Sequence, residues 1–219
     1  MFVILLGPPG AGKGTQAELL AASLGVPKIS TGELFREAMA QGTALGQDVA
    51  TYIDRGQLVP DETTMGVLRK RLENPDAEAG AVLDGFPRTI KQAEQLDCLL
   101  DERGSTVDRV IDVDVPTAEI VRRLSGRWTC RNCNASYHEQ FAPPKQPGLC
   151  DRCGGALYQR SDDRPEAITV RLDTYRQRTE PLVDYYKKAL KLRVVAGNQP
   201  KDVVTRALIS AVTDEALGN

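Results

Sequence analysis

Histidine is nearly absent from this chain: His138 is the one histidine among 219 residues. A Ser-His-Asp triad, a histidine general base or a multi-histidine metal centre is therefore not expected. The chain also lacks a long hydrophobic run. The apolar run at its start, residues 1–6, has no basic flank and ends in Gly7 and Pro8, so it predicts neither a signal peptide nor a membrane span. We expect a cytoplasmic protein with no membrane partner.

Low-complexity sequence is missing too, and the composition is 41% hydrophobic and 26% charged, which excludes a disordered or collagenous chain. A large excess of one charge is equally absent, because 28 basic residues stand against 30 acidic ones. This balance argues against a protein whose whole surface binds nucleic acid. Of the basic residues, 19 are arginine and 9 are lysine. Because a guanidinium group can donate two hydrogen bonds to one phosphate, this bias favours phosphate chemistry.

Five short β-rich runs alternate with stretches of helical length. They are continuous apolar runs, which are typical of strands buried on both faces, so they predict a parallel sheet covered by helices, an α/β fold. Helix start signals agree, because Pro116 and Pro200 suit a first turn and Asp61 and Thr89 suit N-caps. The expected strands are residues 2–6, 26–29, 81–83, 110–115 and 192–195.

Two segments interrupt this alternation. Residues 126–163 show no periodicity, contain Pro143, Pro144 and Pro147, and hold four of the five cysteines. They predict an inserted module. Residues 30–59 are helical by pattern and lie between two expected strands, which predicts a second, helical insertion.

A glycine-rich loop follows the first expected strand and precedes an amphipathic helix that we expect to begin near Gln16. Its glycines let successive N–H groups face one point, the helix N-terminus adds positive potential, and Lys13 supplies a cation for β- and γ-phosphates. The pattern predicts a nucleoside triphosphate site, although a glycine-proline turn that happens to contain a lysine would look similar. Gly14 stands where the general pattern has Ser or Thr, so the hydroxyl falls on Thr15. The phosphate-binding residues are Gly10, Ala11, Gly12, Lys13, Gly14 and Thr15.

Asp84 directly follows the third expected strand, at its carboxyl end, and precedes a Gly-Phe-Pro-Arg turn that ends at Arg88. A carboxylate at the carboxyl end of a strand beside the phosphate loop is placed to hold Mg²⁺ through water, and Arg88 can bind a phosphate. The alternative is a glycine-proline turn that merely ends the strand. Thr89 and Gln92 have the spacing of a capping box, so Gln92 has a purely structural alternative as well.

Four cysteines form two Cys-x2-Cys pairs separated by sixteen residues. Four thiolates at this spacing predict a tetrahedral zinc site, and because sulfur fills all four positions, the metal is expected to be structural. Disulfides or idle thiols are the alternatives, and a reducing cytoplasm disfavours disulfides. Cys98 lies on a separate helical stretch, where we expect it to pack among leucines. The zinc-binding set is Cys130, Cys133, Cys150 and Cys153.

Together, the glycine loop, the Ser-Thr-Gly tripeptide at 30–32, residues 56–61, residues 84–88 and the late arginines resemble adenylate kinase nearly from end to end. The resemblance implies a P-loop NTPase-like, five-stranded parallel sheet flanked by helices, with two moving parts. The moving parts implied are an NMP-binding segment of residues 30–59 and a small zinc-bearing LID of residues 126–163. The implied CORE comprises residues 1–29, 60–125 and 164–219.

The activity implied by the resemblance is that of a nucleoside monophosphate kinase, which catalyses ATP + AMP = 2 ADP reversibly with Mg²⁺ by closure of the LID and the NMP segment. Its implied place is purine nucleotide salvage and energy homeostasis, its implied partners are ATP, AMP and ADP, and the chain is expected to be a monomer. Elementary chemistry favours the same acceptor. A phosphate oxygen of AMP is already anionic near neutral pH, so no base need remove a proton.

Residue roles are also implied by the resemblance, with one departure: Glu33 stands where Asp is expected, which weakens any role for that side chain. The implied ATP site comprises residues 10–15, Arg123, Arg127, Ser136, Tyr137 and Gln199. The implied AMP site comprises Thr31, Arg36, Gln57, Leu58, Val59, Gly85, Phe86, Pro87, Arg88, Gln92, Arg160 and Arg171. The implied catalytic set is Lys13, Arg88, Arg123, Arg160 and Arg171.

A nucleic-acid-binding protein is the main alternative, with the cysteine module as a zinc ribbon whose aromatic side chains interleave with arginines. Residues 126–163 carry five cations and four anions, so binding that rests on phosphate contacts would be weak at physiological salt. We therefore expect no nucleic-acid partner. A kinase for UMP, CMP or another monophosphate, or one that uses GTP as donor, stays open, because Thr31 and Gln92 favour adenine only by family likeness.

Overall fold

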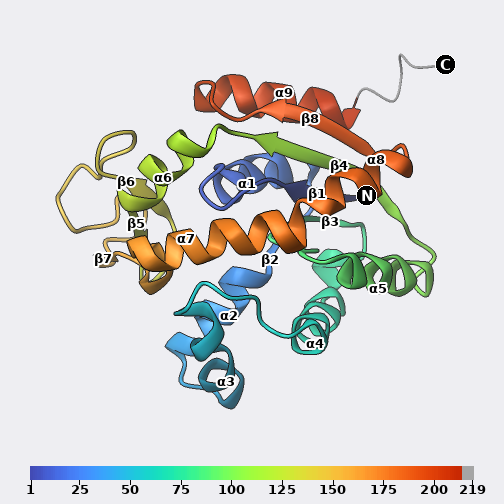
Figure 1. Cartoon of the computed structure of the whole chain (residues 1–219), viewed down its shortest axis with the longest axis horizontal. Helices are drawn as coiled ribbons and strands as arrows, with labels where there is room; N and C mark the ends of the chain where they lie inside the picture. The colour runs from blue at the N-terminus through green and yellow to red at the C-terminus, as the bar shows by residue number, and fades with distance from the viewer. Residues whose placement is uncertain (214–219) are drawn as a thin grey trace.

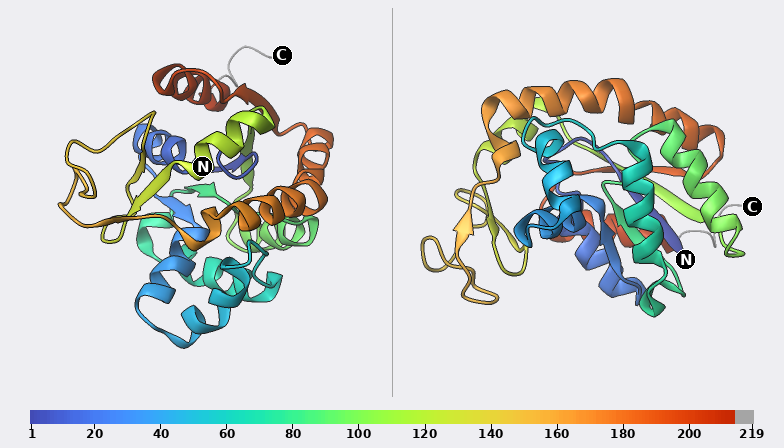
Figure 2. Two further views of the ribbon diagram at one scale, coloured as in Figure 1. Left: turned by 60° about the vertical axis from the view of Figure 1, so that its left-hand side comes forward. Right: turned by 90° about the horizontal axis from the view of Figure 1, so that it is seen from below.

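The computed structural model of the chain describes residues 1–213 (Figure 1). A five-stranded parallel sheet runs through it in the order β2-β3-β1-β4-β8, and helices cover both of its faces (Figure 2). The predicted α/β class and the five-stranded sheet are therefore confirmed. Residues 214–219 of the expected CORE range lie outside the described residues. The strands of this sheet are β1 (Phe2–Leu6), β2 (Lys28–Ser30), β3 (Ala81–Asp84), β4 (Val107–Asp114) and β8 (Leu192–Ala196).

Two strands start at other residues than predicted, for local reasons, and the ends of β2, β3, β4 and β8 each differ from the prediction by one residue. β2 begins at Lys28 rather than at Val26, because the N–H of Val26 bonds to the carbonyl of Ala21 at 3.2 Å and still belongs to the end of the preceding helix. β4 begins three residues earlier than expected, since Val107 already pairs with Phe2 of β1. None of these differences changes the order of elements.

Helix starts are set by the residues just before them. Thr89 is confirmed as an N-cap, because its Oγ1 accepts a hydrogen bond from the N–H of Gln92 at 3.1 Å. The N-cap prediction for Asp61 is wrong: Pro60 takes that position, and Asp61 is the first helical residue, with its carboxylate turned to Gln92. The first helix begins at Lys13, earlier than the predicted start. Pro116 and Pro200 stand one residue before their helices rather than in the first turn. The helices are α1 (Lys13–Leu24), α2 (Thr31–Ala40), α3 (Ala44–Ile53), α4 (Asp61–Leu72), α5 (Ile90–Asp101), α6 (Thr117–Ser125), α7 (Pro165–Thr174), α8 (Pro181–Lys188) and α9 (Lys201–Thr213).

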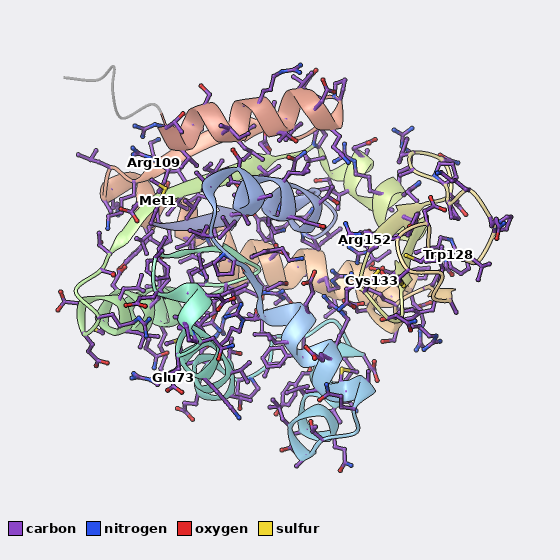
Figure 3. All side chains as sticks on the ribbon, turned by 180° about the vertical axis from the view of Figure 1, so that it is seen from behind. Met1, Glu73, Arg109, Trp128, Cys133 and Arg152 are labelled. Carbon is purple, nitrogen blue, oxygen red and sulfur yellow. The ribbon has the colours of Figure 1, made fainter. Side chains whose placement is uncertain are left out.

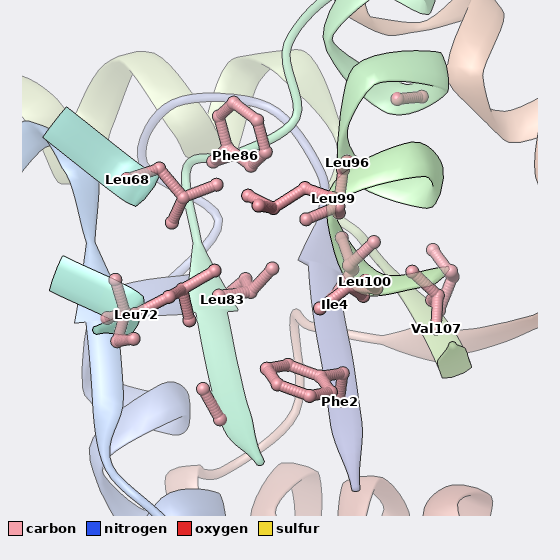
Figure 4. Close-up of a cluster of buried hydrophobic side chains, with 14 of the residues drawn as sticks. Phe2, Ile4, Leu68, Leu72, Leu83, Phe86, Leu96, Leu99, Leu100 and Val107 are labelled. Atoms are coloured by element: carbon pink, nitrogen blue, oxygen red, sulfur yellow. The ribbon is translucent and has the colours of Figure 1, made fainter. Parts of the chain in front are cut away.

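Alternating side chains of β1 divide the core into two layers, because successive residues of a strand point to opposite faces. Phe2, Ile4 and Leu6 join a cluster with α4, α5 and α8 (Figure 4). Val3 and Leu5 join a second cluster with α1, α6, α7 and α9. All five side chains are at most 3% exposed, and full burial of a Val, Leu, Ile or Phe side chain contributes about 1.5–3 kcal/mol. The central strand is thus anchored on both sides, which fixes the loop that follows it.

Two insertions project from this body (Figure 1). Residues 30–59, the helical insert, form α2 and α3, as their pattern predicts, and close on a small core of Phe35, Val49 and Val59. Residues 126–163, the cysteine insert, carry a three-stranded antiparallel sheet in the order β6-β5-β7. Its strands are β5 (Arg127–Cys130), β6 (Ser136–His138) and β7 (Leu157–Tyr158).

The prediction that Cys98 packs in the core is wrong. It lies on α5 as expected but is exposed, whereas Leu96, Leu99 and Leu100 are buried. On a helix, residues three and four apart share a face, so these leucines define the core-facing side and leave Cys98 outside it. Within residues 1–213, no helix has the length and apolar character needed to cross a membrane.

Candidate active site

One cavity of about 670 Å³ opens where the carboxyl ends of β1, β2 and β3 meet, the edge of an open α/β sheet at which ligands bind. Its volume falls within the range of small-molecule sites. Phe86 is the one predicted nucleotide-site residue that does not line it, because its side chain is 1% exposed and packs in the core beside α4 and α5 (Figure 4). The predicted residues that do line the cavity are residues 10–15, Thr31, Arg36, Gln57, Leu58, Val59, Asp84, Gly85, Pro87, Arg88, Gln92, Arg123, Arg127, Ser136, Tyr137, Arg160, Arg171 and Gln199.

The loop between β1 and α1 depends on close backbone approach. Gly7 has a φ of 131°, and a β-carbon there would come within 2.6 Å of the carbonyl oxygen of Val113. Gly12 adopts φ 92° at the N-cap of α1, a left-handed conformation that suits glycine. The first helical hydrogen bond runs from the N–H of Gln16 to the carbonyl of Gly12 at 3.1 Å. The N–H groups before it have no partner inside the helix, which makes this end a site for an anion.

Gly14 has a structural reason to be glycine rather than serine or threonine. A β-carbon at this position would lie 3.3 Å from Oδ2 of Asp84. The absence of a side chain therefore lets the Asp84 carboxylate sit against the first turn of α1. The predicted magnesium ligand and the phosphate loop are brought together by this contact.

Lys13 is held over its own loop. Its Nζ donates hydrogen bonds to the carbonyl oxygens of Gly7 at 2.7 Å and Pro8 at 2.8 Å. Burial lowers the pKa of Lys13 from 10.5 to about 8, with Arg88 acting in the same direction and Asp84 opposing it. An anion bound in the cavity would favour the charged ammonium and raise this pKa again.

Asp112 is a carboxylate beside the phosphate loop that the sequence reasoning missed, although it is not among the residues that line the cavity. It pairs with Leu6 at the carboxyl end of β4, so it flanks the phosphate loop on the side opposite to Asp84. Burial and the neighbouring Asp114 raise its pKa, while Lys13 lowers it. Within the described part of the chain, its Oδ1 has no hydrogen-bond partner. The available signal was a carboxylate near the carboxyl end of a strand that pairs with β1, although Asp112 lies two residues before the end of β4.

Several arginines line the cavity and lie close to one another. Burial, followed by the charges of Arg127 and Arg36, lowers the pKa of Arg160 to about 9. Burial and the charge of Arg171 lower the pKa of Arg88 in the same way. Burial is the larger cause for both arginines, and repulsion from neighbouring cations adds to it, so an anion bound among them would stabilise their charged forms. The site is therefore suited to polyanions.

Two buried carboxylates that the sequence reasoning also missed orient these arginines. Arg127 donates from Nε and Nη2 to the two oxygens of Asp163 at 2.8 and 2.5 Å. Arg171 forms ion pairs with Asp162 at 3.2 Å and Asp163 at 2.8 Å. Burial acts to raise the pKa of Asp162, but Arg171 and Arg127 outweigh it and hold this pKa below its usual range. The adjacent acidic pair at the end of the cysteine insert was the available signal.

Gln92 is tied into the turn that precedes it. Its Oε1 accepts a hydrogen bond from the N–H of Arg88 at 2.7 Å, and its Nε2 donates to Asp61 at 2.7 Å. In the capping box predicted from the spacing, Gln92 would instead accept from Thr89. Arg88 Nε and Thr31 Oγ1 donate to the carbonyl of Gly85 at 2.7 and 3.0 Å. The amide of Gln92 thus has structural partners and keeps one N–H for a ligand.

The four cysteines of the insert converge as their spacing predicts. Their Sγ atoms all lie within 4.8 Å of one another, with 3.5 Å between Cys130 and Cys153 and 3.6 Å between Cys133 and Cys150. Tetrahedral ligands about 2.3 Å from zinc stand about 3.8 Å apart, so the cluster fits such an ion. All five cysteines are free thiols, so the disulfide alternative is wrong. The Tyr137 hydroxyl lies 3.4 Å from Cys150 Sγ, which links the cluster to the cavity wall.

Fold and site together define a class: a P-loop nucleotide-binding α/β protein whose cavity is built for phosphates. Comparison with known proteins narrows this. Residues 5–191 match the family model of adenylate kinase. The chain is 52% identical over 212 residues to an adenylate kinase of Symbiobacterium thermophilum, covering 97% of this chain and 98% of that one. It is 54% identical over 199 residues to one of Archaeoglobus fulgidus, covering 91% and 92%. The chain belongs to the adenylate kinase family and is a nucleoside monophosphate kinase.

Proposed function

We propose that this chain catalyses ATP + AMP = 2 ADP reversibly with Mg²⁺, with ATP over the β1–α1 loop and AMP beside the helical insert. One observation carries the proposal: Lys13 and arginines from the body and both inserts line a single cavity. Two polyanions can approach each other only where positive charge from several sides offsets their repulsion. Family membership supports the reaction class.

On the ATP side, residues 10–15 would bind the β- and γ-phosphates through backbone N–H groups and the Lys13 ammonium. Arg123 would bind the same phosphates from a fixed position, because its Nε donates to Glu119 at 2.9 Å and its Nη1 to the carbonyl of Gly197 at 3.1 Å. Arg127 is fixed by Asp163. Ser136, Tyr137 and Gln199 would complete this side.

On the AMP side, Arg36 and Arg88 would bind the phosphate. Arg36 has a buried Nε with no partner among the described residues, and burial lowers its pKa, so a phosphate oxygen would satisfy it. The hydrogen bond from Arg88 Nε to the carbonyl of Gly85 orients the Arg88 side chain. The remaining residues of this side would contact the nucleoside or hold the turn: Thr31, Gln57, Leu58, Val59, Gly85, Phe86, Pro87 and Gln92, with Phe86 contributing backbone alone.

The chemical step would rest on charge rather than on a base. His138 lines the cavity, but its Nδ1 accepts the N–H of Gln140 at 3.0 Å, so it stays a structural residue. Charge that spreads over the transferring phosphoryl group would be stabilised by preorganised cations, and removal of one such donor costs about 10²- to 10³-fold in rate. The donors are Lys13, Arg88, Arg123, Arg160 and Arg171.

The residues present fit two metal roles. Asp84, against the first turn of α1, would hold Mg²⁺ through water, and the ion when bound supplies further neutralisation of phosphate charge. Cys130, Cys133, Cys150 and Cys153 would hold a structural zinc ion, which stabilises an insert with little core of its own.

The two inserts would close as the LID (126–163) and the NMP segment (30–59) on the CORE (1–29, 60–125 and 164–219). Ser161 of the cysteine insert donates to Asp54 of the helical insert at 2.5 Å, so the two inserts meet. Closure excludes water and so protects ATP from hydrolysis. Purine nucleotide salvage and energy homeostasis, in a cytoplasmic monomer, are the setting that this reaction would serve.

The zinc-ribbon alternative has less support, because two of the aromatic side chains it would use are already covered by arginines of the protein itself. Arg131 lies over the ring of Tyr158 and Arg122 over that of Phe141, each at 4.5 Å. Measuring ADP formed from ATP with AMP present and absent tests the proposal. Equal ATP consumption without AMP, or no ADP with both nucleotides and magnesium, would refute it. Replacing AMP by UMP or CMP, and ATP by GTP, would identify the preferred nucleotides.

A further inference from the structure

The cysteine insert is joined to helix α1 by an ion pair that spans 134 residues of sequence. Nη2 of Arg152 lies 2.5 Å from Oε1 of Glu18. Glu18 lies on α1 and lines the cavity, so the pair stands at the rim of the site, on the side of the phosphate loop. Arg152 lies in the turn between Cys150 and Cys153 on the insert (Figure 3).

We propose that Glu18 and Arg152 are positioning residues that latch the cysteine insert onto α1 and thereby tighten the binding of ATP. The inference rests on the proposed function, because it assumes that the insert closes over ATP. Neither residue belongs to the phosphate-binding set of the proposed function. Their effect is to favour the closed arrangement, in which the arginines of the insert face the cavity.

The position of the pair supports this role. Arg127 begins β5 and is fixed to Asp163 at the base of the insert, whereas Cys130 ends β5. Arg152 is attached near this far end, since Cys153 Sγ lies 3.5 Å from Cys130 Sγ. Four strand residues span about 10 Å, so the latch and the base act at opposite ends of β5. Two separated attachments restrict rotation of the insert in a way that one attachment does not.

The turn that carries Arg152 is itself ordered. The N–H of Gly154 bonds to the carbonyl of Cys150 at 2.8 Å, and the N–H of Cys150 bonds to the carbonyl of Gly155 at 2.9 Å. Arg152 is therefore presented from a fixed backbone, which reduces the entropy lost when the pair forms. Its side chain is 56% exposed and that of Glu18 is 48% exposed, so water and salt weaken the attraction.

The magnitude follows from this exposure. Exposed ion pairs have coupling energies that correspond to a factor of about 1.5 to 5 in an equilibrium constant. Loss of the latch should therefore raise the dissociation constant for ATP by about that factor. It should change the KM for AMP less than the affinity for ATP, because Arg160 is the one residue of the cysteine insert in the proposed AMP site.

A double-mutant cycle tests the latch in the full-length, metal-replete protein. The variants are Glu18→Gln, Arg152→Gln, their combination, and the charge swap Glu18→Arg with Arg152→Glu. The dissociation constant for ATP is measured by titration calorimetry at low and at high salt. Each single variant should weaken ATP binding, the double variant should weaken it no further, the swap should restore it, and high salt should abolish the differences.

Arg131→Gln is the matched control, because it removes the same charge from the same insert, where Arg131 lies over the Tyr158 ring. Its ATP affinity should stay near that of the unaltered chain. Unchanged melting temperatures check that each variant folds.

Additive effects in the double variant, a swap that fails to recover, or an equal loss in Arg131→Gln would overturn the latch. These outcomes differ from failure of the proposed function, which would appear as an unaltered chain that forms no ADP from ATP and AMP.

Discussion

Replacement of Lys13 by methionine should separate activity from stability. Lys13 Nζ donates to two loop carbonyls at 2.7 and 2.8 Å, and burial lowers its pKa from 10.5 to about 8. At 1.36 kcal/mol for each pH unit, this depression corresponds to about 3 kcal/mol by which the folded state disfavours the charged ammonium. Because Lys13 borders an open cavity, water offsets part of this amount, so about 3 kcal/mol is an upper limit. Lys13→Met removes the unfavourable charge and keeps a similar volume.

The expected result is a free energy of unfolding that is unchanged or higher by up to about 3 kcal/mol, together with a fall in kcat of about 10²- to 10³-fold. Chemical denaturation and a coupled assay of ADP formation measure the two quantities. Lys188→Met, which removes an exposed lysine from the end of α8, is the control and should change neither. A variant that loses more than about 1 kcal/mol of stability, or keeps activity within about tenfold, would refute the reasoning, because Lys13 would then support the fold rather than the ligand.

Three further predictions test the metal cluster, the charge of the cavity and the helical insert. Cys133→Ser, or verified removal of metal, should lower the melting temperature by about 2–4 °C for each kcal/mol of stability lost. The single-turnover rate should change by less than about tenfold. An unchanged melting temperature would show that the cluster is dispensable for stability. At pH 8.5 ATP binding should take up protons, because the phosphates raise the pKa of Lys13 from about 8. The stability of the protein without nucleotide should increase between about pH 8 and 10.5, since the unfolded chain binds more protons there. Calorimetry in two buffers and denaturation across this range would show neither effect if Lys13 kept its ordinary pKa. Gly46→Ala should lower the free energy of unfolding by about 1–3 kcal/mol, because the added β-carbon would lie 2.2 Å from the carbonyl oxygen of Ala38. The control Gly66→Ala, whose β-carbon would meet no atom within 4 Å, should raise the free energy of unfolding by about 0.5–1 kcal/mol. Equal effects of the two variants in thermal melts would contradict this packing.

Local sequence patterns predicted the strands and helices, but they did not predict the contacts that side chains make between these elements. The apolar run 2–6 gave the bounds of β1 correctly, because a strand buried on both faces has no polar position to blur its ends. The N-cap of α5 was also predictable, since Thr89 bonds to an N–H only three residues away. Asp61 carried the same kind of signal, but its carboxylate bonds to Gln92 on another helix. The burial of Cys98 was predicted wrongly, because the leucines near it in the sequence do not determine which side of the helix faces the sheet. That side is fixed only when the helix packs.

The sequence by itself determined the phosphate loop, the spacing of the four cysteines and the alternation of strands and helices. These features lie within short stretches whose geometry is fixed by backbone conformation and side-chain period. Only the tertiary structure decided how charges are paired around the cavity: Asp163 with Arg127, Asp112 beside the loop, and Glu18 with Arg152. Such pairs join residues 36 and 134 positions apart, and which charges meet across such distances depends on how the sheet, its helices and the two inserts pack, which no local pattern specifies.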